Sequence, residues 1–292
     1  MRAQVTLIPA ESKKLIAKAV VKLDEVQDAF KNHRILIALG SSTIFIVEEL
    51  VGKLPDISSE VWIRGLVTPK GTCSVKKVTE WQIAREGEGG VHASEFPFMW
   101  LFERGDLKRG TPLNKILEQM KLRDLYIKGV NAIDPSGRVG ILTEDRFRGG
   151  TSGYVFSRQR EVGFKTIFPV GLEKMIPTPI AEAAKEVEPS AVLDYSMGRH
   201  VGLLTADGIV ITEPKAIDIL TGARAVPISA GGLAGAEGAI TMVVSGIDEQ
   251  VTKAINYIEG VKGTKLPELR LRECKNCTRV GCVLKGDNKP WC

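Results

Sequence analysis

A strand, a turn of small residues and a helix follow one another over residues 34–52, and this order constrains the fold more than any other feature. Residues 34–39 are mostly apolar and include β-branched side chains, which predicts a buried strand. A Gly-Ser-Ser-Thr turn at 40–43 ends it, and a helical apolar pattern over 44–51 closes at Gly52. Such an order opens a βαβ unit, whose strands lie parallel in one sheet.

Predicted strands and helices continue to follow one another up to about residue 190. Further strands are predicted at 61–67, 125–129, 138–142 and 165–170, and helices at 11–31, 113–121 and 180–186. We therefore predict an α/β fold, a doubly wound and mostly parallel sheet, for a first domain at residues 1–190. Residues 68–112 show no steady period, and we interpret them as an insertion or an irregular β region.

The pattern changes after residue 190. Strands are predicted at 200–204, 208–212 and 239–245, and helices at 214–220 and 248–258. These elements predict a smaller α+β domain at 191–265, whose order resembles a ferredoxin-like sandwich. Residues 266–292 form a third unit, a tail rich in cysteine.

The net charge and the hydropathy of the chain limit the kinds of molecule that it is expected to bind. The chain carries a net charge of +5 that is spread along its length, whereas nucleic-acid binders concentrate basic residues on one face or arm. We expect a small anionic molecule or an acidic partner, and no nucleic acid. No run of 18 apolar residues occurs, and the first residues lack a signal-peptide core, so the sequence predicts a cytoplasmic protein without a membrane span.

Four of the five cysteines lie in the tail, at Cys274, Cys277, Cys282 and Cys292. In the cytosol thiols stay reduced, so clustered cysteines indicate a metal before a disulfide. The spacing Cys-x2-Cys-x4-Cys-x9-Cys allows the first pair to turn both sulfurs toward one ion, and nearby Lys and Arg residues offset thiolate charge. The sequence therefore predicts a metal site with these four ligands.

The identity of the metal stays open between two alternatives. Zinc ribbons commonly pair two Cys-x2-Cys knuckles, and this tail has one. Three cysteines close together with a fourth further on suit a 4Fe-4S cluster at least as well. An iron-sulfur cluster is favoured over zinc, with a structural or a redox role. A redox role would imply a redox protein partner.

The turn at residues 40–43 is the first candidate ligand site. Backbone N–H groups and hydroxyls at a helix N-terminus attract phosphate or carboxylate, although the same Ser and Thr side chains also serve as ordinary helix caps. The turn and the following residues 45–50 resemble the first phosphate-binding turn of ribose-5-phosphate isomerase and its relatives. Residues 124–134 and 137–140, followed by the glycine turn at 149–151, resemble further elements of that superfamily.

The resemblance covers roughly residues 10–175 and is to the superfamily of sugar-phosphate isomerases, glucosamine-phosphate deaminases and CoA transferases. It implies an open, mostly parallel sheet with ligands at the carboxyl ends of the strands. The ligand-binding residues that it implies are Gly40, Ser41, Ser42, Thr43, Lys128, Asn131, Gly149, Gly150 and Thr151. The isomerases carry acidic residues where Lys128 and Asn131 stand, which argues against sugar-phosphate isomerisation but not against anion binding.

Candidates for catalysis are Lys128, beside a glycine at a strand end, and Glu237, within the glycine-rich run 231–238. The leading hypothesis is an enzyme that acts on a small anionic metabolite, either a phosphorylated compound or a CoA thioester. One alternative is a non-catalytic metabolite or redox sensor of the same fold, favoured by the lack of a recognisable acid/base pair. Another is an iron-sulfur electron-transfer subunit. A homo-oligomer is compatible with each of them.

Overall fold

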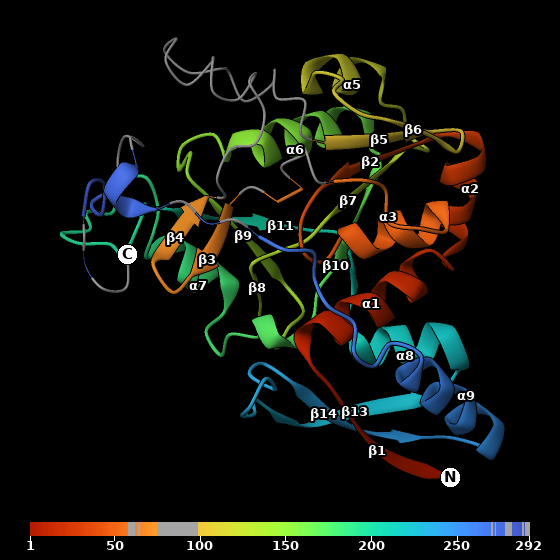
Figure 1. The fold of residues 1–292 in the computed structure, drawn as a ribbon. Helices are drawn as coiled ribbons and strands as arrows, with labels where there is room; N and C mark the ends of the chain where they lie inside the picture. The colour runs from red at the N-terminus through yellow and green to blue at the C-terminus, as the bar shows by residue number, and fades with distance from the viewer. Residues whose placement is uncertain are drawn as a thin grey trace.

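A central mixed sheet organises the molecule, and the protein has a mixed α/β fold (Figure 1). The computed structural model describes residues 1–57, 62–63, 65–74, 99–269, 271, 273–277, 282–287 and 289. The order of strands across the central sheet is β12-β10-β7-β2-β5-β6. Their bounds, in that order, are Ile209–Ile211, Lys165–Pro169, Leu125–Lys128, Arg34–Ala38, Met99–Glu103 and Asp106–Lys108.

The strands β12, β10, β7 and β2 run parallel, whereas β5 and β6 join antiparallel at one side. The predicted strands at 34–39, 125–129 and 165–170 are confirmed as β2, β7 and β10. The stretch 68–112, interpreted as an insertion or an irregular β region, contributes β5 and β6 to the main sheet, and its strand β4 (Gly71–Ser74) belongs to a separate two-stranded sheet. Its residues 75–98 lie outside the described part of the chain.

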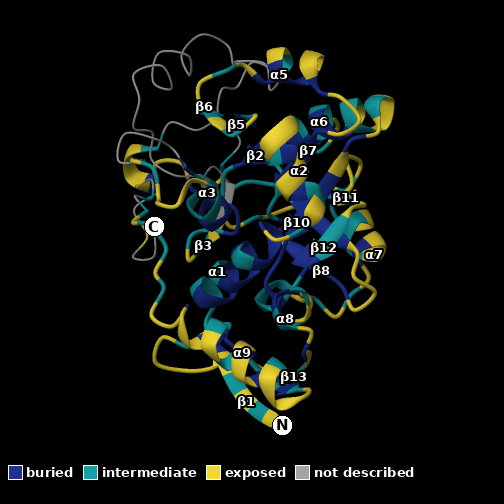
Figure 2. Ribbon diagram, turned by 90° about the vertical axis from the view of Figure 1, so that its right-hand side faces the viewer, coloured by how far each residue is buried: buried dark blue, intermediate teal, exposed yellow. Residues whose placement is uncertain are grey.

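Helices cover both faces of this sheet because successive strand residues point to opposite sides. Ile35 and Ile37 of β2 face one core together with helices α1, α3, α8 and α9. Leu36 faces the other, where α5 and α6 pack. The bounds of these helices are Pro9–Val20, Ile44–Val51, Glu213–Thr221 and Asp248–Glu259 for α1, α3, α8 and α9, and Leu113–Gln119 and Gly150–Val162 for α5 and α6. Figure 2 shows the buried residues gathered in the central sheet and α1.

A second sheet has the order β1-β14-β13 and is antiparallel, with β1 (Arg2–Leu7) taken from the start of the chain. Its partners β14 (Ile240–Ser245) and β13 (Arg224–Ala230) come from the far end, and α9 packs on β1 and β14. The elements predicted for a domain at 191–265 are thus divided, because β12 joins the central sheet. β11 (Gly202–Ala206) pairs instead with β9 (Val139–Thr143), which in turn pairs with β8 (Ala132–Ile133).

The remaining described elements are short or lie at the periphery. They are α2 (Asp24–Asn32), the hairpin of β3 (Gly65–Thr68) and β4 (Gly71–Ser74), α7 (Ile180–Lys185), and the single 3-10 turns η2 (Leu172–Lys174) and η3 (Cys274–Asn276). Among the described residues, no helix has the length and apolar character needed to cross a membrane.

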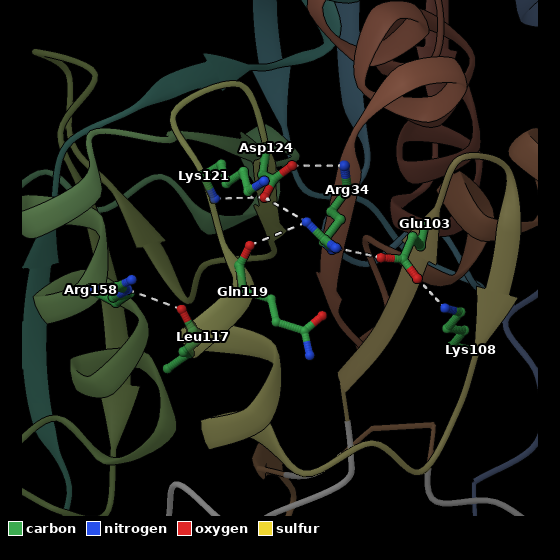
Figure 3. A network of polar contacts seen from close by, with 8 residues as sticks. All are labelled: Arg34, Glu103, Lys108, Leu117, Gln119, Lys121, Asp124 and Arg158. Atoms are coloured by element: carbon green, nitrogen blue, oxygen red, sulfur yellow. Dashed lines mark hydrogen bonds and ion pairs between the residues drawn. The ribbon is translucent and has the colours of Figure 1, made fainter.

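A polar network with a structural role lies at the amino ends of the parallel strands (Figure 3). The buried Asp124, just before β7, accepts hydrogen bonds from the backbone N–H groups of Arg34 (2.9 Å) and Lys121 (2.7 Å). The guanidinium of Arg34 also pairs with Glu103 on β5. This network holds β2, β5 and β7 together at the amino ends of the parallel strands.

Candidate functional site

Three neighbouring parallel strands end together at the carboxyl edge of the central sheet. β2, β7 and β10 end at Ala38, Lys128 and Pro169, and Ala38 lies directly across from Lys128 in the register. In open α/β sheets, ligands bind at this edge. The side chains that follow these three strand ends therefore define the candidate site.

After β2 the chain makes the turn at residues 40–43 and enters α3. The Thr43 hydroxyl donates to the carbonyl of Ala38 (2.8 Å), and the N–H groups of Thr43 and Ile44 donate to the carbonyl of Gly40. Within the described residues, the N–H groups of Ser41 and Ser42 have no hydrogen-bond partner. The turn thus presents two backbone donors beside the N-terminus of α3, a combination that suits an anion.

The end of β7 contacts this turn directly. A Cβ placed on Gly129 would lie 3.4 Å from Cβ of Ser42, so the two segments touch. Ser42 is buried, and Lys128 is half-buried at the adjacent position.

The third strand end supplies a lysine that reaches both segments. Lys174, in the η2 turn after β10, donates from Nζ to the carbonyl of Val130 (2.7 Å) and to Oγ of Ser42 (3.4 Å). Burial of the amine lowers the pKa of Lys174 to about 8; the charge of Lys13 also lowers it, while Glu173 and Glu213 act in the opposite sense. Among the described residues, no carboxylate lies within ion-pair distance of this amine, so its acceptors are neutral.

Behind Lys174 lies a buried ion pair between α1 and η2. Nζ of Lys13 is 2.6 Å from Oε1 of Glu173, and the two side chains are only 6% and 11% exposed. The second carboxylate oxygen of Glu173 is buried and has no hydrogen-bond partner in the described part of the chain. It folds over Gly171, where an added Cβ would approach Oε2 to 1.8 Å, so only glycine permits this side-chain position.

A second carboxyl group supports the η2 turn from the start of α8. Glu213 is fully buried, and both of its carboxylate oxygens accept from the N–H of Leu172, at 3.1 and 3.0 Å. Burial, together with the negative charge of Glu173, raises the pKa of Glu213 to about 7. Two carboxyl groups in different environments and an amine with a lowered pKa are the components that enzymes use for acid–base or covalent chemistry.

No protein-family model matches the chain, nor does any curated protein or solved structure. Function must therefore be argued from the residues of the site themselves.

The structure brings together part of the set predicted from sequence. Gly40, Ser41, Ser42, Thr43 and Lys128 all lie at the carboxyl edge just described. Asn131 follows the end of β7, but its side-chain oxygen accepts a hydrogen bond from the N–H of Leu142 in the neighbouring strand β9 (3.0 Å). It therefore stabilises the β8–β9 region.

The other predicted residues have their described contacts elsewhere. Gly149, Gly150 and Thr151 begin α6, and the first two glycines lie against Leu204 and Thr143 respectively. Glu237 is exposed on the loop between β13 and β14, where its carboxylate accepts from the N–H of Gly235 (3.0 Å). Among the described residues, no hydrogen bond or ion pair connects these positions to the turn at 40–43.

Sequence reasoning missed Lys13, Glu173, Lys174 and Glu213. Lys13 was hidden in the amphipathic pattern of α1, and the four residues come from three segments that are far apart in the chain. One signal was available: Glu173 and Lys174 come just after a buried strand, β10, as Lys128 ends β7. Charged residues at the carboxyl end of a parallel strand are candidates for function.

The cysteine tail lies beside the region of the hairpin β3–β4 (Figure 1). The carbonyl of Cys274 accepts from the N–H groups of Cys277 (3.0 Å) and Gly286 (2.9 Å), which joins the two short turns of the tail. Cys282 pairs with Arg199 in an antiparallel bridge, next to a parallel bridge between Gly198 and Thr72. Over the described part of the tail, no group of three potential ligands is placed to hold a metal, and Cys292 lies outside that part.

Proposed function

We propose that the protein is an enzyme acting on a small anionic metabolite, a phosphorylated compound or a CoA thioester, bound at the carboxyl edge of its central sheet. We further propose a doubly wound fold of the superfamily of sugar-phosphate isomerases, deaminases and CoA transferases. The parallel order β12-β10-β7-β2, with helices on both faces, supports this assignment. The order α8-β13-β14-α9, with β1 beside β14, supports a ferredoxin-like second unit.

One observation carries the proposal: the Lys174 amine lies between the 40–43 turn and the end of β7. An anion placed at the N–H groups of Ser41 and Ser42 would meet a cation that has no carboxylate partner of its own among the described residues. In such a partly desolvated site, charge–charge attraction is stronger than in bulk water. The turn would position the anion and Lys174 would neutralise its charge.

Thermal unfolding in the presence of inorganic phosphate, ribose 5-phosphate and CoA tests this proposal. A ligand that binds the folded state at about 100 times its Kd stabilises it by about 2.7 kcal/mol, which raises Tm measurably. We expect at least one of these ligands to raise the Tm of the wild type. The shift should shrink in Lys174→Met and Ser42→Ala, and persist in Lys115→Met, which removes an exposed lysine.

The proposal is wrong if none of the three ligands changes Tm, or if Lys174→Met retains the full shift. Lys174→Met is a suitable variant because methionine keeps an unbranched stem and removes a desolvated charge. Turnover assays with the ligand that gives the largest shift then distinguish an enzyme from a binding protein.

For the tail we propose a metal site with Cys274, Cys277, Cys282 and Cys292 as ligands, holding a 4Fe-4S cluster or, as the alternative, zinc. The spacing of the cysteines carries this proposal, and the bond from Gly286 to the Cys274 carbonyl supports it by joining the two turns that bear three of the thiols. Because the described thiols do not form a ligand group, we assign no catalytic step to the metal.

A further inference from the structure

We propose that the Lys174 amine is a nucleophile that forms an imine with an aldehyde or ketone group of the bound anionic metabolite. This inference rests on the proposed function and deepens it, because it names the reacting group of the substrate: a carbonyl compound that also carries a phosphate or carboxylate.

The first support is the set of groups that surround the Lys174 amine. Its acceptors are the Val130 carbonyl and the Ser42 hydroxyl, both neutral. The adjacent carboxylate, Glu173, is engaged by Lys13 at 2.6 Å, and Glu213 is engaged by the N–H of Leu172. The charges of these two carboxylates raise the pKa of Lys174 through space, but among the described residues neither of them accepts a hydrogen bond from its amine.

The second support is the nearby positive charge of Lys13. A lysine becomes a nucleophile when it is desolvated or lies near another cation, because both effects favour the neutral amine. Burial is the largest cause of the lowered pKa of Lys174, and the charge of Lys13 acts in the same direction, against the negative charges of Glu173 and Glu213. Lys13 itself keeps its charge partner, Glu173, so of the two lysines only Lys174 is left with neutral acceptors.

The third support is position. Lys174 is half-buried as a residue and follows β10, and its buried amine reaches the edge where the 40–43 turn offers N–H donors to an anion. A metabolite whose anionic end is held by the turn would bring a carbonyl group a few atoms away toward the amine. Holding two reactants in this way converts a bimolecular step into one within the complex.

The step is balanced without a further reactant. The nitrogen lone pair attacks the carbonyl carbon, and the resulting carbinolamine loses its oxygen as water, which carries away the two amine protons. A carbon–nitrogen double bond replaces the carbon–oxygen double bond. Added borohydride would deliver hydride to the imine carbon and water would supply a proton to nitrogen, which makes the bond permanent.

Reductive trapping on the full-length wild-type protein is the test. The protein is incubated with pyruvate or with dihydroxyacetone phosphate, borohydride is added, and modified lysines are located by peptide mass spectrometry. We expect Lys174 to be modified at least tenfold more than exposed lysines such as Lys115 and Lys215. Glycerol phosphate, which has the anion but no carbonyl, should reduce the modification, and Lys174→Arg should abolish it.

The outcomes separate this inference from the proposed function. If glycerol phosphate or lactate raises Tm but Lys174 is not modified, the imine is wrong and the anion site stands. If Lys174 is trapped equally well by neutral glycolaldehyde, and glycerol phosphate does not compete, the nucleophile stands and the anion site fails. Modification spread evenly over surface lysines overturns the inference, and this readout on the wild type remains valid even if Lys174→Arg does not fold.

Discussion

The buried carboxyl group of Glu213 makes a quantitative prediction about stability and pH. Its pKa is about 7 in the folded protein, because of burial and the nearby charge of Glu173, against an ordinary value of 4.5. Between these two pH values the folded state binds more protons than the unfolded state, so this group lowers stability as pH rises from about 4.5 to about 7. At 1.36 kcal/mol per pKa unit, the loss amounts to ~3 kcal/mol at pH 8.

Glu213→Gln should remove this dependence, since glutamine keeps the size and an oxygen that can accept from Leu172 N–H. The assay is urea unfolding of wild type and variant from pH 4.5 to 8.5. We expect the stability of the variant relative to wild type to rise by ~3 kcal/mol between pH 4.5 and 8. The exposed Glu182→Gln controls for the loss of one surface carboxylate. A difference between wild type and Glu213→Gln that stays constant with pH would refute the reasoning.

Three further outcomes are expected. Lys13→Met should lower the free energy of unfolding, measured in urea, by about 3–5 kcal/mol, because it leaves a buried carboxylate unpaired. Adding Glu173→Gln should restore most of this loss. Equal stabilities of the single and double variants would contradict the prediction. Asp124→Ala should lower the free energy of unfolding in the same assay by about 2 kcal/mol, because two backbone N–H groups lose their acceptor. Replacement of the exposed Asp106 by Ala should not lower it. Anaerobically purified protein should contain iron and sulfide, or zinc, and Cys277→Ser should lose it; unchanged metal content in that variant would argue against the tail site.

The local strand–turn–helix pattern predicted the part of the fold that forms the candidate site. β2, the turn at 40–43 and α3 were predicted because apolar periodicity and small turn residues are adjacent in sequence. Gly52 ends α3 with a φ of 78°, the left-handed conformation that its position after the helix indicated. These are local properties, and the sequence reports them directly.

The pairing of distant segments could not be read in this way. β1 was missed because it alternates exposed and half-buried residues next to a helix that dominates the pattern, and its partner β14 is distant in the sequence. The cluster of Lys13, Glu173 and Glu213 likewise joins segments that are distant in the sequence. Each residue is ordinary in its own segment, and only the tertiary fold brings the charges together.

The placement of β1 also sets the order in which the protein can mature on the ribosome. Arg2 pairs with Ser245, so β1 leaves the ribosome more than 200 residues before its hydrogen-bonding partner, β14. The βαβ units of the central sheet can assemble before then, since β2, α3 and β7 are complete by residue 128. During that interval β1 has an unpaired strand edge, which is a hazard for aggregation in nascent chains. A nascent chain stalled before residue 240 should accordingly hold the central strands in place while its amino-terminal segment stays accessible to chaperones or proteases.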